Sequence, residues 1–205
     1  MSAARPIFHL LAGPNGAGKS TLYRALVASG SISSQLEFVN ADLYEQSHLQ
    51  HITDLQKRSE AARDWADSRR DALLTAKVGF VSETVFSHES KLALIMQAQA
   101  IGFDVVLYVV SLDDPQHLLA RVSQRVREGG HNVPAQRILE RYPRTMANLK
   151  KAVRLADLAF VYDAAELEQG AHLLVAMCEG EKTRSLVTKL PLWAQTLLID
   201  KGLVT

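Results

Sequence analysis

The residues with the clearest chemical potential form a glycine-rich stretch near the start of the chain, LAGPNGAGKST. The spacing Gly13-x-x-x-x-Gly18-Lys19-Ser20 is typical of a phosphate-binding loop, in which glycines let the backbone amides point at phosphate oxygens. A following helix adds the positive end of its dipole. In this pattern Lys19 neutralises the outer phosphates, and the Ser20 hydroxyl binds Mg²⁺. The predicted nucleotide contacts are Gly13, Pro14, Asn15, Gly16, Ala17, Gly18, Lys19, Ser20 and Thr21.

Two carboxylates follow other apolar runs of the sequence. Asp42 in FVNADLY is placed to accept a proton from an attacking hydroxyl or to orient it, although an Asp there equally suits a turn or a helix cap. Glu83 and Thr84 in FVSETVF are placed to bind sugar hydroxyls and phosphate, or simply to end a strand. Because reactive groups collect at the carboxyl ends of parallel strands, Asp42, Glu83 and Thr84 are predicted substrate contacts.

Arginines are concentrated around a Gly129-Gly130 break in RVSQRVREGGHNVPAQRILERYPR. Two helices joined by such a break suit a lid over residues 114–155 that closes arginines over a transferring phosphate. We expect most of these side chains to lie on a solvated helix face and one or two to be functional. The candidates are Arg121, Arg125, Arg127, Arg137, Arg141 and Arg144.

The pattern of short β-branched runs and longer helical stretches predicts an α/β fold, with a mostly parallel central sheet between helical layers. The expected strands span residues 6–13, 37–42, 79–84, 104–111 and 158–163, and a hairpin over 172–190 turns at EGEK. The expected helices span 19–29, 53–77, 87–102 with Ser87 as cap, 114–129 and 134–155.

Composition limits the class of protein. The 205 residues carry 47% hydrophobic side chains and a net charge of +1, which fits a single domain over 1–205 and argues against broad nucleic-acid binding. A lone Cys178 excludes an internal disulfide, and no apolar window is long enough for a membrane span or a signal peptide. These features predict a cytoplasmic protein.

Two late aspartates, Asp163 in AFVYD and Asp200 in TLLID, loosely match the Mg²⁺-binding strand end of motor and switch NTPases. An ordinary strand or helix end explains each equally well. The sequence has no adjacent acidic pair of the kind used for ATP hydrolysis, so we expect an acceptor other than water.

The ordered set GPNGAGKST, FVNAD, SETVFS, RVREGGHNVP, RILERY and LADLAFVYD resembles the zeta-toxin-like P-loop kinase family over residues 7–163. The resemblance implies a kinase core with a helical lid, ATP or GTP with Mg²⁺, and catalytic roles for Lys19, Asp42, Arg127 and Arg141. It also implies phosphorylation of UDP-N-acetylglucosamine on a sugar hydroxyl and inhibition by an antitoxin protein. Where many relatives read VYDNS, this chain reads VYDAA, which affects the expected contacts to the adenine.

The sequence therefore predicts a phosphotransferase that acts on a small-molecule hydroxyl, and the resemblance implies that the acceptor is a nucleotide sugar. Two alternatives stay open at this point. One is a kinase of the same fold for another metabolite, and the other is a nucleotide-gated binding module with weak ATPase activity.

Overall fold

The computed structural model describes residues 4–127, 134–166, 172–199 and 203–204. Its strands form one sheet in the order β2-β3-β1-β4-β5-β6-β7-β8. The strands are β1 (Ile7–Ala12), β2 (Glu37–Val39), β3 (Phe80–Thr84), β4 (Asp104–Ser111), β5 (Leu158–Asp163), β6 (Leu173–Glu179), β7 (Lys182–Ser185) and β8 (Leu203–Val204).

The first five strands are mutually parallel, and β1 lies between β3 and β4. Parallel neighbours need crossover connections, and helices supply them here. β6 runs antiparallel to both β5 and β7, and Gly180 takes a left-handed φ of 54° in the turn between β6 and β7. The mostly parallel sheet and the late hairpin predicted from the sequence are thus confirmed.

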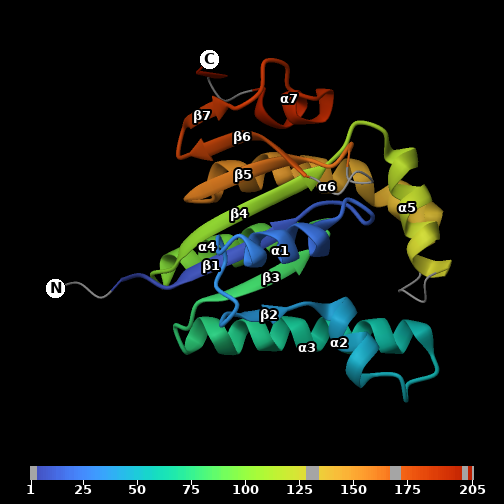
Figure 1. Ribbon diagram of the computed structural model, residues 1–205. Coiled ribbons are helices and arrows are strands. Elements are labelled where there is room, and N and C mark those ends of the chain that lie inside the picture. Colours follow the sequence, from blue (N-terminus) through green and yellow to red (C-terminus); the bar gives the residue numbers. More distant parts are fainter. Residues whose placement is uncertain (1–3, 128–133, 167–171, 200–202, 205) are drawn as a thin grey trace.

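Helices cover both faces of the sheet, as Figure 1 shows with α1 in front and α4 and α6 behind. One apolar cluster joins the sheet to α3, α4, α6 and α7, and a second joins its other face to α1, α5 and the start of α6. This arrangement is the predicted three-layer fold. The helices are α1 (Lys19–Ala28), α2 (Ala41–His48), α3 (Leu55–Thr75), α4 (Ser90–Ala100), α5 (Pro115–Arg127), α6 (Ala135–Leu155) and α7 (Leu192–Leu198).

The largest departure from the sequence prediction lies after β2. The expected strand over 37–42 ends at Val39, and α2 begins at Ala41. Asn40 caps this helix, because its Oδ1 accepts a hydrogen bond from the Leu43 amide at 3.1 Å. Asp42 therefore lies in the first turn of a helix, where the sequence suggested a strand end.

Two helix starts also differ. α3 begins at Leu55 because the Asp54 carboxylate caps it, accepting from the Gln56 amide at 2.9 Å. Ser87 was expected to cap the next helix, but α4 begins only at Ser90. A turn intervenes, with left-handed backbone at Phe86.

Helix α7 was not predicted, and long-range contacts hold it. The Asp113 carboxylate accepts from the Trp193 amide at 2.7 Å, and the Trp193 indole donates to Asp163 Oδ1 at 2.8 Å.

Asp200 and the Gly129-Gly130 break lie outside the described residues. Among the described helices, none is both long and apolar enough for a membrane span, and the expected cytoplasmic location stays a prediction.

Candidate nucleotide and acceptor site

The glycine-rich loop joins β1, at the centre of the sheet, to α1. Its backbone is left-handed at Gly16, with φ 83°, and at Gly18, with φ 89°. A Cβ on Gly16 would lie 2.5 Å from the Leu118 carbonyl oxygen of α5, and one on Gly13 would overlap the Val110 carbonyl oxygen of β4. Glycine is therefore required at both positions, and the loop packs tightly between β4 and α5.

Lys19 lies at the inner side of this loop and is buried. Its ammonium group donates to the Gly13 carbonyl at 3.0 Å and to the Pro14 carbonyl at 3.1 Å. Glu83 Oε1 lies 3.8 Å away. Burial lowers the pKa of Lys19, and the charges of Glu83 and Asp42 oppose that shift. The lysine is thus held where a phosphate bound by the loop would meet it.

Glu83, at the end of β3, connects the loop to the neighbouring strand. Its Oε2 accepts from the Ser20 hydroxyl at 2.8 Å and from Asn40 Nδ2 at 3.0 Å. Burial raises the pKa of Glu83, while Lys19 and the Ser20 hydroxyl oppose the shift. Asn40 therefore has two roles, capping α2 through Oδ1 and holding Glu83 through Nδ2.

The oxygen atoms of Ser20 and Glu83 suit Mg²⁺, which prefers oxygen ligands and in nucleotide sites takes few protein ligands beside phosphates and water. The described residues hold no group of three or more His, Cys, Asp or Glu side chains suited to a metal by themselves. The Ser20–Glu83 pair thus fits a Mg²⁺ ion that arrives with a nucleotide.

Asp42 lies at the mouth of the loop and is half-exposed. Arg125, from the first helix of the predicted lid, places Nη1 4.0 Å from Asp42 Oδ2. The charges of Asp42 and Arg125 also act on both Lys19 and Glu83. The structure therefore brings together Lys19, Ser20, Asp42 and Glu83, as the sequence suggested, and adds Arg125.

The other predicted contacts lie around this centre. Thr84 is partly buried, and its Oγ1 accepts from the Phe86 amide at 3.3 Å. Thr21 Oγ1 accepts from Arg24 at 3.3 Å. Arg127 is exposed at the last residue of α5, and its catalytic role stays a prediction, as does that of Arg141 on α6.

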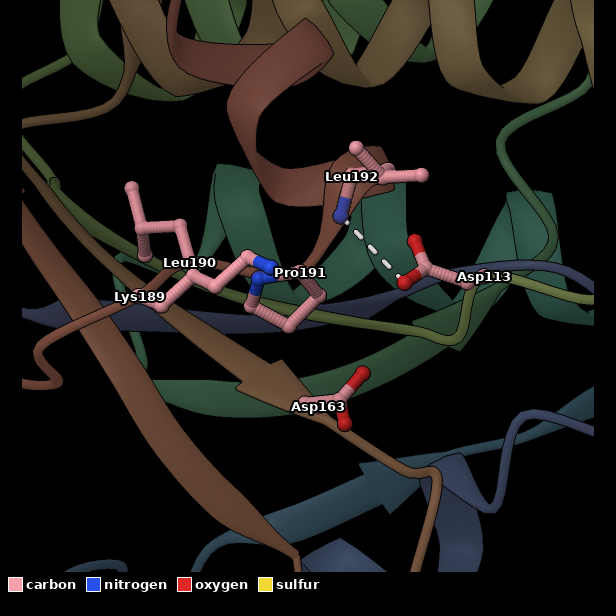
Figure 2. A pocket seen from close by; sticks show the side chains of 6 residues that line it. All are labelled: Asp113, Asp163, Lys189, Leu190, Pro191 and Leu192. Carbon is pink, nitrogen blue, oxygen red and sulfur yellow. Dashed lines mark hydrogen bonds between the residues drawn. The ribbon is translucent and has the colours of Figure 1, made fainter.

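Asp163 has a structural role instead of the metal-binding role considered from the sequence. It lines a pocket of about 380 Å³ with Asp113 and residues 189–192, shown in Figure 2. One Asp163 oxygen accepts from the Trp193 indole and the other from the Ala165 amide at 3.3 Å. The carboxylate thus helps to attach α7, and β4 separates its strand from β1.

The sequence analysis did not distinguish Arg125 from the other lid arginines, although the structure places it beside Asp42. Arg125 stood among six lid arginines, and the resemblance favoured Arg127. A usable signal was helical periodicity: Arg125 lies one turn after Arg121 and three residues after the buried Val122, which places it near the core-facing side of α5. Arg127 is rotated away from that side.

The fold and the loop together define a phosphotransferase of the P-loop kinase class. A family model described as zeta toxin matches residues 1–168. The chain belongs to the zeta toxin family, which confirms the resemblance seen in the sequence. A sequence comparison with curated proteins gives no match.

Solved structures share the fold. One from the PezAT chromosomal toxin–antitoxin system of Streptococcus pneumoniae has a TM-score of 0.60 at 15% identity, covering 84% of this chain and 72% of that one. A putative kinase from Chloroflexus aurantiacus has a TM-score of 0.54 at 16% identity, covering 69% and 80%. A chain of the Pnkp1/Rnl/Hen1 RNA repair complex has a TM-score of 0.57 at 19% identity, covering 73% and 47%.

Proposed function

We propose that this protein transfers the γ-phosphoryl group of ATP to a hydroxyl of a small molecule, with a nucleotide sugar such as UDP-N-acetylglucosamine as acceptor. One observation carries the proposal. The Asp42–Arg125 pair lies at the mouth of the loop in which Lys19, Ser20 and Glu83 converge. A carboxylate and a guanidinium beside a phosphate-binding loop suit transfer to a hydroxyl.

On the donor side, residues 13–21 hold the phosphates through backbone amides, and Lys19 neutralises the outer ones. Ser20 and Glu83 would hold Mg²⁺, which would supply positive charge to neutralise the phosphates. Glu83 contacts Ser20 and lies close to Lys19, so we place it on the donor side of the site. This placement differs from the acceptor contact that the resemblance implies.

On the acceptor side, Asp42 orients the attacking hydroxyl and accepts its proton. Its side chain is 42% exposed, so an incoming substrate can reach it. Arg125 stabilises the charge that develops on the transferring group, and Thr84 lies at the neighbouring strand end.

We further propose that an antitoxin protein regulates the chain. The family is that of zeta toxins, and one structural neighbour comes from a toxin–antitoxin system. The net charge of +1 gives no reason to propose a nucleic-acid partner.

The proposal is tested by incubating the protein with ATP, Mg²⁺ and UDP-N-acetylglucosamine and detecting the phosphorylated sugar nucleotide by mass spectrometry. Asp42→Asn should lower turnover by a factor of about 10² or more with ATP affinity unchanged, because it removes only the base. Asp71→Asn is the matched control, since Asp71 is exposed near the end of α3 that leads into the start of β3. If Asp42→Asn keeps wild-type turnover, the assigned role of Asp42 is wrong.

A metabolite extract extends the test to other acceptors. A different phosphorylated product would replace the nucleotide sugar and leave the kinase assignment standing. Absence of any product under conditions where ATP binds would contradict the proposed function.

A further inference from the structure

Helix α3 carries a buried charge in the middle of its apolar face. The core-facing residues of this helix are Ala62, Ala66, Arg70, Leu73 and Leu74, and Arg70 is only 5% exposed. A buried charge costs free energy unless it is paired, and an apolar side chain of similar size often serves stability equally well. The contacts of Arg70 indicate what the charge does at this position.

The Arg70 guanidinium is held from two sides. On its own helix it forms an ion pair with the Asp67 carboxylate, which also accepts from Lys91 of α4 at 2.8 Å. Burial acts to raise the pKa of Asp67, but the hydrogen bonds from Lys91 and Arg70 outweigh burial and lower it, so the carboxylate stays charged. On the sheet, Arg70 Nη1 donates to Ser82 Oγ of β3 at 3.1 Å.

Ser82 connects Arg70 to the neighbouring strand. Ser82 is fully buried, and its hydroxyl donates to the Val39 carbonyl at 3.1 Å. Val39 pairs with Ser82 in the parallel ladder and is the last residue of β2, a three-residue strand at one end of the strand order, next to α3 (Figure 1). Because short edge strands open easily, a side-chain hydrogen bond at the strand end helps to fix where the following chain begins.

The residues that follow Ser82 and Val39 belong to the site. Glu83 follows Ser82 and faces the phosphate-binding loop, since successive side chains of a strand point to opposite faces. Asn40 follows Val39. Its Nδ2 donates to Glu83 at 3.0 Å, and its Oδ1 caps the helix that carries Asp42. The hydrogen-bonded chain from α3 therefore ends directly behind the two side chains that join the donor side of the site to the acceptor side.

We propose that Arg70 is a positioning residue for phosphoryl transfer. Through Ser82 it fixes the end of β2, so that Asn40 holds Glu83 on the donor side and places the first turn of α2, with Asp42, on the acceptor side. The inference rests on the proposed function and adds to it a charge that contacts neither substrate. An apolar side chain at position 70 would pack against the sheet but would leave the Ser82 hydroxyl free to rotate.

Two variants interrupt this chain at different points. Arg70→Met places an apolar side chain on the apolar face of α3, and Ser82→Ala removes only the bridging hydroxyl while Asp67 still pairs with Arg70. Arg69→Met is the matched control. Arg69 is the adjacent arginine of α3 and also binds β2, through Glu37 at 2.6 Å, but it is exposed and holds the start of the strand.

Nucleotide affinity gives the first measurement, because it requires no acceptor. Calorimetry follows the binding of a non-hydrolysable ATP analogue to the full chain over a range of Mg²⁺ concentrations. Arg70→Met and Ser82→Ala should each need about tenfold more Mg²⁺ for tight binding, as is typical when the support of a metal ligand is lost. Arg69→Met should need no more than the wild type. Thermal unfolding checks that each variant is folded at the temperature used.

Hydrogen exchange in α2 gives a second measurement, which requires no ligand. The Leu43 amide donates to Asn40, so its exchange reports whether the first turn of the helix is held. This amide should exchange at least about tenfold faster in Arg70→Met and Ser82→Ala, and at the wild-type rate in Arg69→Met. Arg70→Lys, which keeps a charge and a donor, should restore part of both effects.

The outcomes separate this inference from the proposed function. If Ser82→Ala keeps either the wild-type Mg²⁺ requirement or the wild-type exchange of Leu43, the inference is overturned, and this holds even if Arg70→Met fails to fold. Equal effects in Arg69→Met also overturn it, because any attachment of α3 to β2 would then suffice. Both shifts without a phosphorylated product from any acceptor would retain the positioning role at the nucleotide site and contradict only the proposed function.

Discussion

Lys19 is a buried cation whose own backbone loop supplies two of its partners. The Gly13 and Pro14 carbonyls and the Glu83 carboxylate orient its ammonium group in the absence of any ligand. An oriented charge needs little rearrangement when phosphate binds, which is how such groups stabilise a transition state.

Lys19→Ala should therefore lower phosphoryl transfer by a factor of about 10² to 10³ or more. The variant should still fold, because the Glu83 carboxylate keeps its hydrogen bonds from Ser20 and Asn40, so we expect only a small change in the unfolding temperature. Steady-state turnover measures the first effect and calorimetric unfolding the second. Lys182→Ala on β7, at an exposed lysine, should change neither. Wild-type turnover in Lys19→Ala would contradict the role of the loop.

Glu83→Gln tests whether this residue serves the metal or the acceptor. The amide keeps the size of the side chain but loses the charge next to Ser20, so about tenfold more Mg²⁺ should be needed for tight nucleotide binding. Titration of Mg²⁺ against nucleotide affinity measures this. An unchanged Mg²⁺ requirement with a raised acceptor KM would instead support the acceptor contact implied by the resemblance.

Some residues of the site were predicted from the sequence and others were not, for physical reasons. Lys19 and Ser20 were found because the loop is continuous and its spacing is fixed by phosphate geometry. Arg125 was not singled out because its meeting with Asp42 joins residues 83 positions apart across α5 and α2, and no local pattern encodes that distance. The role of Asn40 was also missed, since one side chain serves both a helix cap and Glu83.

At the scale of elements, α2 shows how a capping residue overrides a strand pattern. The run EFVNAD was interpreted as one strand because Phe38 and Val39 are apolar residues that favour strands. Asn40 satisfies a free amide of the helix, so the strand ends at Val39 and the helix starts at Ala41. Helix α7 escaped prediction for a different reason, because the carboxylate that caps it, on Asp113, is remote in sequence.

The contact between the loop and α5 can be tested at Gly16. Gly16→Ala places a Cβ 2.5 Å from the Leu118 carbonyl oxygen and also strains a φ of 83°, so we expect a loss of about 2–4 kcal/mol of stability and weaker nucleotide binding. Gly30→Ala is the matched control, since Gly30 has φ 75° with no atom within 4 Å of the added Cβ. It should cost only about 1 kcal/mol through backbone strain. Chemical denaturation measures both, and equal losses would contradict the close packing of the loop on α5.

At the scale of the whole molecule, the mostly parallel sheet and the helical layers were predicted from the alternation of apolar patterns, whereas the strand order was not, and the single domain over 1–205 stays a prediction. The sequence did not indicate that a histidine and a tyrosine are buried together at the centre of the sheet. His9 of β1 is buried, and its Nδ1 lies 3.1 Å from the Tyr108 hydroxyl of β4, at the centre of the sheet. Burial lowers the pKa of His9 to about 4 and raises that of Tyr108 to about 12.

The shift at His9 predicts a pH-dependent free energy of unfolding. An unfolded chain binds the His9 proton below about pH 6.5, whereas the folded chain binds it only near pH 4, so the stabilising effect is complete above pH 6.5 and is lost as the pH falls toward 4. The total loss is about 3 kcal/mol, at a slope of up to about 1.4 kcal/mol per pH unit. His9→Gln removes this titrating group and should lower the slope between pH 6.5 and 4.5, as measured by denaturant unfolding, whereas His172, whose pKa burial also lowers, keeps its own contribution. His48→Gln, at an exposed histidine of α2, should keep the wild-type slope. If His9→Gln keeps it as well, His9 is protonated in the folded protein and the sheet centre tolerates that charge.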